Sequence, residues 1–178
     1  GMSDTRVMLT CAVMGHAAGT GAAFCVHQKT TPRGVYQDHI EALQQQLLKE
    51  GATIFELQAD DPRDLSRKAA ATASSWRTHT SGEKMLPENV IDGLARAVGQ
   101  RMKETTSAWG PDPAAAGPHR VELAWAEPVA LNMIHVAFQT VDTAPRRFLI
   151  EARCNGRWQK LVELDDNRHR RHVLGLDQ

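Results

Sequence analysis

The sequence of 178 residues lacks a net charge, because its 21 Lys and Arg residues balance its 21 Asp and Glu residues. A chain with no excess of one sign sets up no overall field that would steer nucleic acid or an anionic membrane toward it. We therefore expect neither a nucleic-acid partner nor a membrane partner.

Cysteines are few, and the three present, Cys11, Cys25 and Cys154, form no C-x-x-C pair. An odd number without that spacing favours free thiols in a reducing compartment over a disulfide framework. The eight histidines show neither H-x-x-x-H nor H-E-x-x-H spacing, which argues against a zinc site. Residue order alone specifies no Ser–His–acid set, so we assign no catalytic residue.

Charged residues are missing altogether from the 20 residues between Val7 and Val26. That length would just span a bilayer, but large apolar side chains are too few for a membrane span. The preceding MSDTR is also a poor basic leader for a signal peptide. The pattern predicts instead a helix over residues 7–28, apolar on all faces and buried on most of them. We expect a soluble protein that is cytoplasmic as the chain stands.

Two further helices are predicted in the N-terminal part of the chain. Residues 38–51, DHIEALQQQLLKEG, have Asp38 as the N-cap of a capping-box pattern. Residues 60–69 begin another short helix, with Asp61 as its cap. Residues 30–34, TTPRG, are predicted to form a loop. We expect residues 1–68 to make up a helical region.

From residue 69 onward the pattern changes to short strands separated by turn residues. The predicted strands are residues 71–75, 119–125, 132–139, 147–154, 157–164 and 169–176. The pair Asn155-Gly156 is the strongest hairpin signal in the chain. Short strands with intervening turns predict an antiparallel β-sandwich over residues 69–178. The fold class expected is therefore α+β by segments, with a short helical region followed by this sandwich.

The second half resembles the galactose-binding-like, discoidin-type β-sandwich family, whose fold is a jelly roll. The segments that carry the resemblance come in the family's order across residues 69–176: ATASS, ENVIDG, Trp109, HRVELAWAEPVALNMIHVAF and FLIEARCNGRWQKLVEL. Ala126 stands where the family often has a glycine before Glu-Pro. The resemblance implies an ancillary sandwich domain that binds a carbohydrate or another small ligand.

The first half resembles the C-terminal end of a family of FAD-dependent oxidoreductases, over RVMLTCAVMGHAAGTGAAFCVHQKTTPRGVYQDHIEALQQQLLKEGA, residues 6–52. Small residues allow a helix to approach the flavin closely. In a full-length flavoenzyme the resemblance places Thr10, Cys11, Ala12 and Val13 at the cofactor. The alternative is that these four residues simply pack, with Cys11 as a small buried apolar side chain.

The glycine-rich G-x-G-x-x-G unit that binds the pyrophosphate of FAD is missing from the chain. By resemblance, we expect a non-catalytic C-terminal part of such an enzyme. FAD would then belong to the parent enzyme, and the chain alone is expected to hold no cofactor and to catalyse no reaction.

Loop residues of the second half supply the other candidate site. Asp92 could bind a ligand, and together with Asn89 it could bind calcium, which takes six to eight oxygen ligands; the alternative is that Asp92 caps a turn completed by Gly93. Trp76 and Trp109 lie near loops and could face a carbohydrate, or could cover the end of the sandwich.

The remaining large aromatic side chains that we assign, Trp125, Phe138 and Trp158, are expected to pack inside the sandwich. Three functions stay open: part of a flavoenzyme, a module that binds carbohydrate or a small ligand, and a structural module. The third follows because an apolar helix without its parent sheet must bury its face elsewhere. It predicts a homodimer through the N-terminal helix, or docking of that helix on the sandwich.

Overall fold

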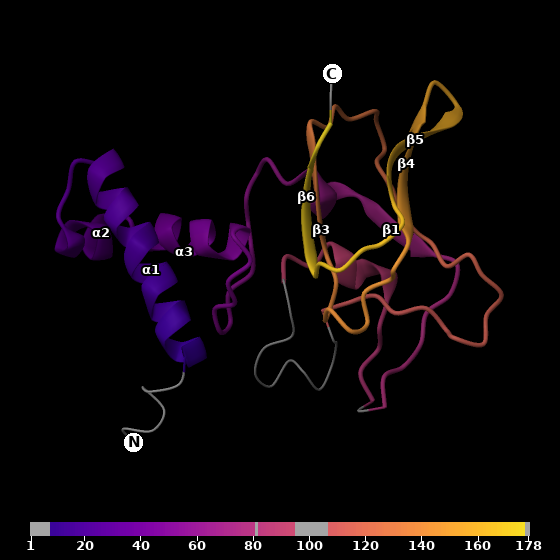
Figure 1. Cartoon of the computed structure of the whole chain (residues 1–178). Helices are drawn as coiled ribbons and strands as arrows, with labels where there is room; N and C mark the ends of the chain where they lie inside the picture. Colours follow the sequence, from indigo (N-terminus) through magenta and orange to yellow (C-terminus); the bar gives the residue numbers. More distant parts are fainter. Residues whose placement is uncertain (1–7, 81, 95–106, 177–178) are drawn as a thin grey trace. The chain divides into compact units, whose positions relative to one another are not determined.

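The computed structural model of the chain describes residues 8–80, 82–94 and 107–176 (Figure 1). The chain divides into two compact units, Gly1–Ala124 and Trp125–Gln178. The boundary expected between residues 68 and 69 stays a prediction. Among the described residues, no helix combines the length and the apolar character that crossing a bilayer requires.

The N-terminal part of the first unit is helical, as expected. Its helices are α1 Met8–His27, α2 Pro32–Asp38 and α3 Ile40–Lys49. The loop predicted over residues 30–34 is wrong, because the Thr31 hydroxyl accepts a hydrogen bond from the Gly34 backbone N–H at 3.2 Å and caps α2. Pro32 occupies the first helical position, where its missing N–H costs nothing.

Asp38 is the last residue of α2 rather than the N-cap of a long helix. His39 stands between α2 and α3 and occupies the N-cap position of α3, without a side-chain capping bond. The predicted capping box at Asp38 is therefore wrong. The reason is that the Thr-Pro signal starts a helix earlier, so that Asp38 already lies inside helical backbone.

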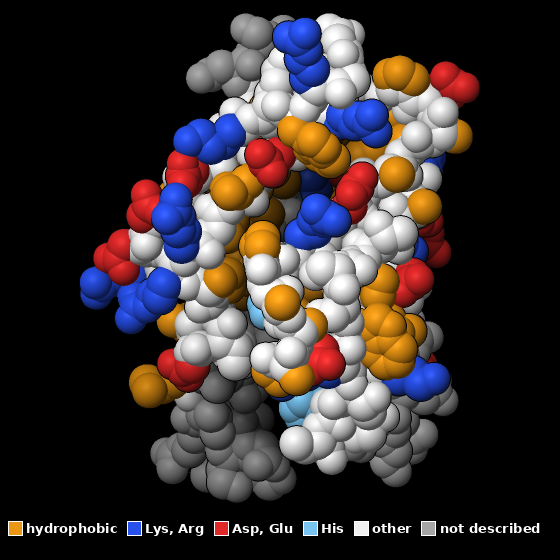
Figure 2. Space-filling model, turned by 90° about the vertical axis from the view of Figure 1, so that its right-hand side faces the viewer, with side chains coloured by type: hydrophobic (Ala, Val, Ile, Leu, Met, Phe, Trp, Pro, Cys, Tyr) orange, Lys and Arg blue, Asp and Glu red, His pale blue; other side chains and the backbone are white. Residues whose placement is uncertain are grey.

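Val35, Leu47 and Leu48 form the buried core of the helical part. Helix α1 contacts both α2 and α3, yet much of its length stays exposed, with Val13 66% and Val26 77% exposed. The expectation that this helix is buried on most faces is therefore not met within the chain. The described residues hold no fully buried large side chain, and hydrophobic side chains lie at the surface among charged ones (Figure 2).

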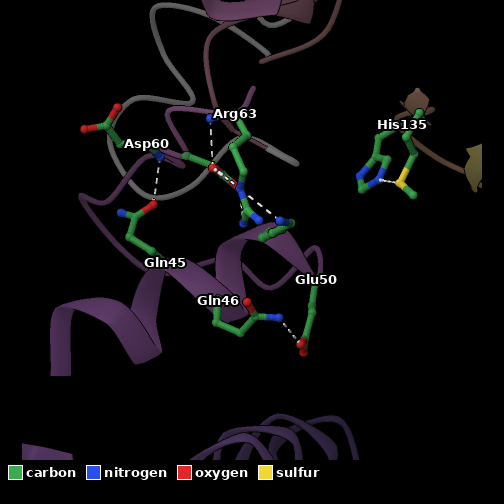
Figure 3. A network of polar contacts seen from close by, with 9 residues as sticks. Gln45, Gln46, Glu50, Asp60, Arg63 and His135 are labelled. Carbon is green, nitrogen blue, oxygen red and sulfur yellow. Dashed lines mark hydrogen bonds and ion pairs between the residues drawn. The ribbon is translucent and has the colours of Figure 1, made fainter. Parts of the chain in front are cut away.

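A linker with little regular structure connects α3 to the first strand. Gln45 reaches it from α3 through both ends of its amide. Its Nε2 donates to the Gln58 carbonyl at 3.0 Å. Its Oε1 accepts from the Asp60 N–H at 2.7 Å, as Figure 3 shows. The helix predicted with Asp61 as its cap is wrong. Asp61 closes a turn, and the short 3-10 helix η2, Leu65–Lys68, begins later with Asp64 as its cap.

Strands of the first unit are β1 Ala70–Ala73 and β2 Val121–Ala124, which pair antiparallel. Ala71 lies opposite Leu123 in this register and is buried, as is Met85 on a neighbouring loop. The 3-10 helix η3, Pro87–Val90, contacts β1. This strand pair and its loops carry the candidate ligand residues of the first unit.

The second unit consists of two antiparallel strand pairs. β3 Met133–Ala137 pairs with β6 Arg171–Gly175, and β4 Phe148–Cys154 pairs with β5 Arg157–Leu164 (Figure 1). Asn155 and Gly156 join β4 to β5 with φ angles of 51° and 77°. These positive values are those of a two-residue type I′ turn, so the hairpin prediction is confirmed.

Aromatic rings connect the two strand pairs of the second unit. The rings of Phe138 and Phe148 are 5.3 Å apart, and those of Phe148 and His172 are 5.4 Å apart. Phe138 thus packs as expected. Trp158 does not, because 53% of it is exposed on β5. The described chain is mixed α+β, with helices in the N-terminal part and antiparallel strands after them.

Candidate functional site

The first candidate site is the N-terminal end of α1. Thr10 is half-buried, and Cys11, Ala12 and Val13 are exposed. Consecutive residues on a helix point in different directions, so these four side chains do not converge on one point. The interpretation of Cys11 as a buried side chain is wrong in this chain. A cofactor held here would need groups from another element as well.

Small residues of α1 face a hollow against α3. Gly15, Gly19 and Ala23 are spaced four residues apart and lie on one side of α1. They line a hollow of about 610 Å³ together with Phe24, and with Gln46 and Glu50 at the far side. A Cβ added at Gly15 or Gly19 would meet no atom within 4 Å. Contacts inside the described chain therefore give no reason for glycine at these two positions.

A histidine–carboxylate pair closes one side of this hollow. His16 Nε2 lies 2.5 Å from Glu50 Oε2, and Gln46 Nε2 donates to Glu50 Oε1 at 2.6 Å. Figure 3 shows Gln46 and Glu50 side by side at the end of α3. The pair fixes α1 against α3, and it becomes an ion pair when the imidazole is protonated. Sequence reasoning missed it, because 34 residues separate the partners and no local pattern connects them.

The second candidate site is a cluster of loops in the first unit. Asn89 is buried, and its Nδ2 donates to the carbonyls of Lys84 and Ala108, at 3.0 Å in each case. Trp109 Nε1 donates to the Ser75 carbonyl at 2.9 Å. These bonds hold the segment that precedes Trp76 beside Trp109, and hold η3 beside the same loop.

Asp92 belongs to this cluster and caps a turn. Its Oδ1 accepts from the Leu94 N–H at 2.8 Å, and Gly93 has a φ of 79°. A Cβ at Gly93 would come within 2.8 Å of the Ala59 carbonyl oxygen, so the turn requires glycine. Burial raises the pKa of the Asp92 carboxyl above its ordinary value, although a hydrogen bond from the Ser107 hydroxyl opposes the rise. The turn-capping alternative thus describes the contacts of Asp92.

The structure brings the segments that carry Trp76, Asn89, Asp92 and Trp109 into one cluster. Trp76 is 45% exposed, whereas the Trp109 ring is half-buried. Asn89 turns its amide nitrogen toward two carbonyl oxygens that a cation would otherwise use. Within the described ranges, no three His, Cys, Asp or Glu side chains gather as a metal site. The calcium site stays a prediction, as does the carbohydrate site.

Comparison with known proteins bears on the first candidate site. A family model described as FAD dependent oxidoreductase matches residues 1–47. The match includes α1, α2 and most of α3, and it agrees with the resemblance seen over residues 6–52. No curated protein and no solved structure matches the chain significantly. Residues 1–47 are thus supported as a segment of an FAD-dependent oxidoreductase.

Proposed function

We propose that the chain carries the C-terminal part of an FAD-dependent oxidoreductase, followed by an ancillary β-sandwich domain of the galactose-binding-like type. The observation that carries this proposal is the family match over residues 1–47. The match includes α1, a helix without Asp, Glu, Lys or Arg that exposes Val13, Met14 and Val26.

Helix α1 suits a position against an FAD-binding body. It has no Asp, Glu, Lys or Arg, and no atom of the described chain lies within 4 Å of a Cβ placed at Gly15 or Gly19. A backbone without Cβ atoms lets a cofactor or another segment approach closely. The first turn holds Thr10, whose backbone N–H is among the first four of the helix and suits a polar cofactor group. FAD, where bound, supplies the redox chemistry, while α1 contributes shape and excludes water.

Flavin content tests this proposal. The protein encoded by the whole reading frame around this chain is purified, and its bound flavin is measured by absorbance against a Gly19→Leu variant. We expect bound FAD in the parent protein and a loss of most of it in the variant, because the leucine side chain occupies the approach side of α1. A parent protein free of flavin contradicts the proposal, as does a variant that keeps its flavin.

The second function we propose is ligand binding by the loop cluster around Trp76, Asp92 and Trp109. What supports it is the set of hydrogen bonds that gathers these segments next to an exposed indole. Calorimetry with neutral oligosaccharides at millimolar concentration, with and without calcium, tests it. Binding that is lost in Trp76→Ala supports the loop cluster; no heat with any sugar counts against it.

We also propose that, without an FAD-binding body, α1 pairs with a second copy of the chain. Its exposed side chains include Val13, Met14 and Val26, and an uncharged helix meets its own copy without repulsion. Light scattering on the purified chain is expected to give the mass of a dimer, and Val13→Asp is expected to give a monomer. A monomeric wild-type chain removes this proposal.

A further inference from the structure

The hairpin of β4 and β5 presents an exposed indole beside a guanidinium. Arg153 and Trp158 lie directly opposite each other in the register, and directly paired residues place their side chains on the same face of a sheet. The next pair on this face is Glu151 with Lys160. Trp158 is the largest exposed side chain here, at 53% exposure.

Charge at this end of the hairpin is positive. Residues 151–161 contain Arg153, Arg157 and Lys160, against Glu151 as the single acidic residue. Lys160 Nζ is already engaged by Glu163 Oε2 at 2.5 Å. Neither the Arg153 nor the Arg157 side chain has a hydrogen bond or an ion pair to any residue that the structure describes. Two guanidinium groups therefore remain available to an anion.

The backbone that carries these groups is fixed before any ligand arrives. The Asn155-Gly156 turn has the positive φ angles of a type I′ hairpin, and the ladder runs without interruption from Cys154–Arg157 to Glu151–Lys160. A rigid scaffold lowers the entropy cost of binding. The spacing of the indole and the guanidinium is thus set by the register of the strands.

We propose that this face of the β4–β5 hairpin binds an acidic saccharide. The Trp158 indole stacks on the apolar face of a sugar ring, and the Arg153 guanidinium donates hydrogen bonds to a carboxylate or sulfate on the same or the next ring. Glu151 and Lys160 stand one rung further along and face the sugar hydroxyl groups.

A membrane fits this surface less well than a saccharide does. A hairpin that enters a lipid interface carries apolar residues at its tip, whereas this tip is Asn155-Gly156. The rung beyond Trp158 is a charged pair, which suits hydroxyl groups rather than acyl chains. The balanced charge of the whole chain also gives no extended basic track for nucleic acid.

The site consists of residues of the second unit, whereas the loop cluster around Trp76 belongs to the first, and it does not depend on the flavoenzyme proposal. Its test uses the full 178-residue chain and measures saccharide binding, not flavin. Failure of one proposal therefore leaves the other standing. Trp76→Ala distinguishes the two candidate saccharide surfaces from each other.

Calorimetry at low ionic strength compares hexagalacturonate with neutral maltohexaose. We expect the acidic sugar to bind, Trp158→Ala to weaken it by about tenfold through loss of stacking, and Trp158→Tyr to retain most of the affinity. Arg153→Gln is expected to remove the preference for the acidic sugar. Tyr36→Ala and Arg33→Gln, exposed residues of α2, are matched controls that leave binding unchanged. Circular dichroism confirms that each variant is folded.

Three results would overturn the proposal. The first is no binding of hexagalacturonate, or of a heparin-derived hexasaccharide, at millimolar concentration. The second is binding that survives both Trp158→Ala and Arg153→Gln but is lost in Trp76→Ala. The third is binding of phosphatidylserine vesicles, sensitive to Trp158→Ala, by a chain that binds neither sugar. Arg153 is exposed at the surface, so Arg153→Gln is expected to fold. Its preference for the acidic sugar therefore tests the proposal even where Trp158→Ala does not fold.

Discussion

Lys49, the last residue of α3, donates a hydrogen bond from Nζ to Asp61 Oδ2 at 2.9 Å and so ties the helix to the linker that follows it. Asp61 also accepts from the Arg63 backbone N–H at 3.0 Å and from the Arg63 guanidinium. Arg63 and then Lys49 lower the pKa of Asp61 well below its ordinary value. One carboxylate thus organises both the turn and the end of α3.

Replacing Asp61 with Asn is expected to lower the free energy of unfolding by about 1 kcal/mol, because the charge-assisted bonds to Lys49 and Arg63 weaken. A carboxyl whose pKa is lowered by folding stabilises the fold above its unfolded pKa. The wild-type advantage is therefore full at neutral pH and is lost as the pH falls below 3.8. Urea denaturation at pH 7 and pH 3 measures it.

The matched control for Asp61→Asn is Asp60→Asn, whose exposed side chain has only its backbone N–H engaged by Gln45. We expect that variant to match the wild-type chain at both pH values. An Asp61→Asn chain as stable as the Asp60→Asn chain at pH 7 would show that the bonds to Lys49 and Arg63 contribute nothing.

Asp92 has the opposite pH dependence, because burial raises its pKa. The folded state then holds the proton more tightly than the unfolded state, so stability falls as the pH rises through the titration of this carboxyl. Asp92→Asn keeps an oxygen for the Leu94 N–H and removes the buried charge. We expect the variant to be more stable than wild type at pH 7 and equal to it in acid.

Thermal unfolding between pH 3 and pH 8 checks the Asp92 prediction, with Glu88→Gln, an exposed residue of η3, as control.

The same variants test whether the loop cluster binds calcium. If Asn89 and Asp92 hold the ion, added calcium raises the unfolding temperature of the wild-type chain but not that of Asp92→Asn. A variant less stable than wild type at pH 7, in the absence of calcium, contradicts the assigned cost of burial.

Asn167 is a buried polar connection in the second unit, at 5% exposure. Its Nδ2 donates to the Pro145 carbonyl at 3.1 Å, and its Oδ1 accepts from the His169 N–H at 2.9 Å and from His172 Nε2 at 2.8 Å. Asn167→Leu leaves all three partners unpaired. We expect a loss of about 2–3 kcal/mol, against no change in the exposed control Asn132→Leu.

Chemical denaturation followed by the near-UV signal of the aromatic side chains measures the Asn167 effect. His172 packs against Phe148 in the ring cluster, so a displaced imidazole also changes that signal. Equal stability of Asn167→Leu and Asn132→Leu would mean that these three hydrogen bonds do not hold the strand pairs.

Local signals in the sequence were enough to predict the strands of the second unit. Residues alternate between half-buried and exposed along β3 and along most of β4, and Asn155-Gly156 joins β4 to β5 as a hairpin. Local signals failed where two of them competed. Thr31-Pro32 and Asp38 both mark a helix start, and only the first one is used.

The candidate sites depend on contacts that no local pattern contains. Trp109 meets Ser75 across 34 residues, and His16 meets Glu50 across the same separation. Trp158 shows a different limit of prediction from the sequence. A period of two tells which residues share a face, but not whether that face is covered, and here it is open.

The most direct test of the whole account is the stability of the 178-residue chain with both Gly15→Ala and Gly19→Ala. The account holds that no atom of the described chain lies within 4 Å of a Cβ placed at either glycine. Alanine in a helix interior is then favourable, and we predict a gain of about 1–2 kcal/mol in the free energy of unfolding for the two positions together. A loss of stability would contradict the account, because it would mean that the chain itself already packs closely against both glycines.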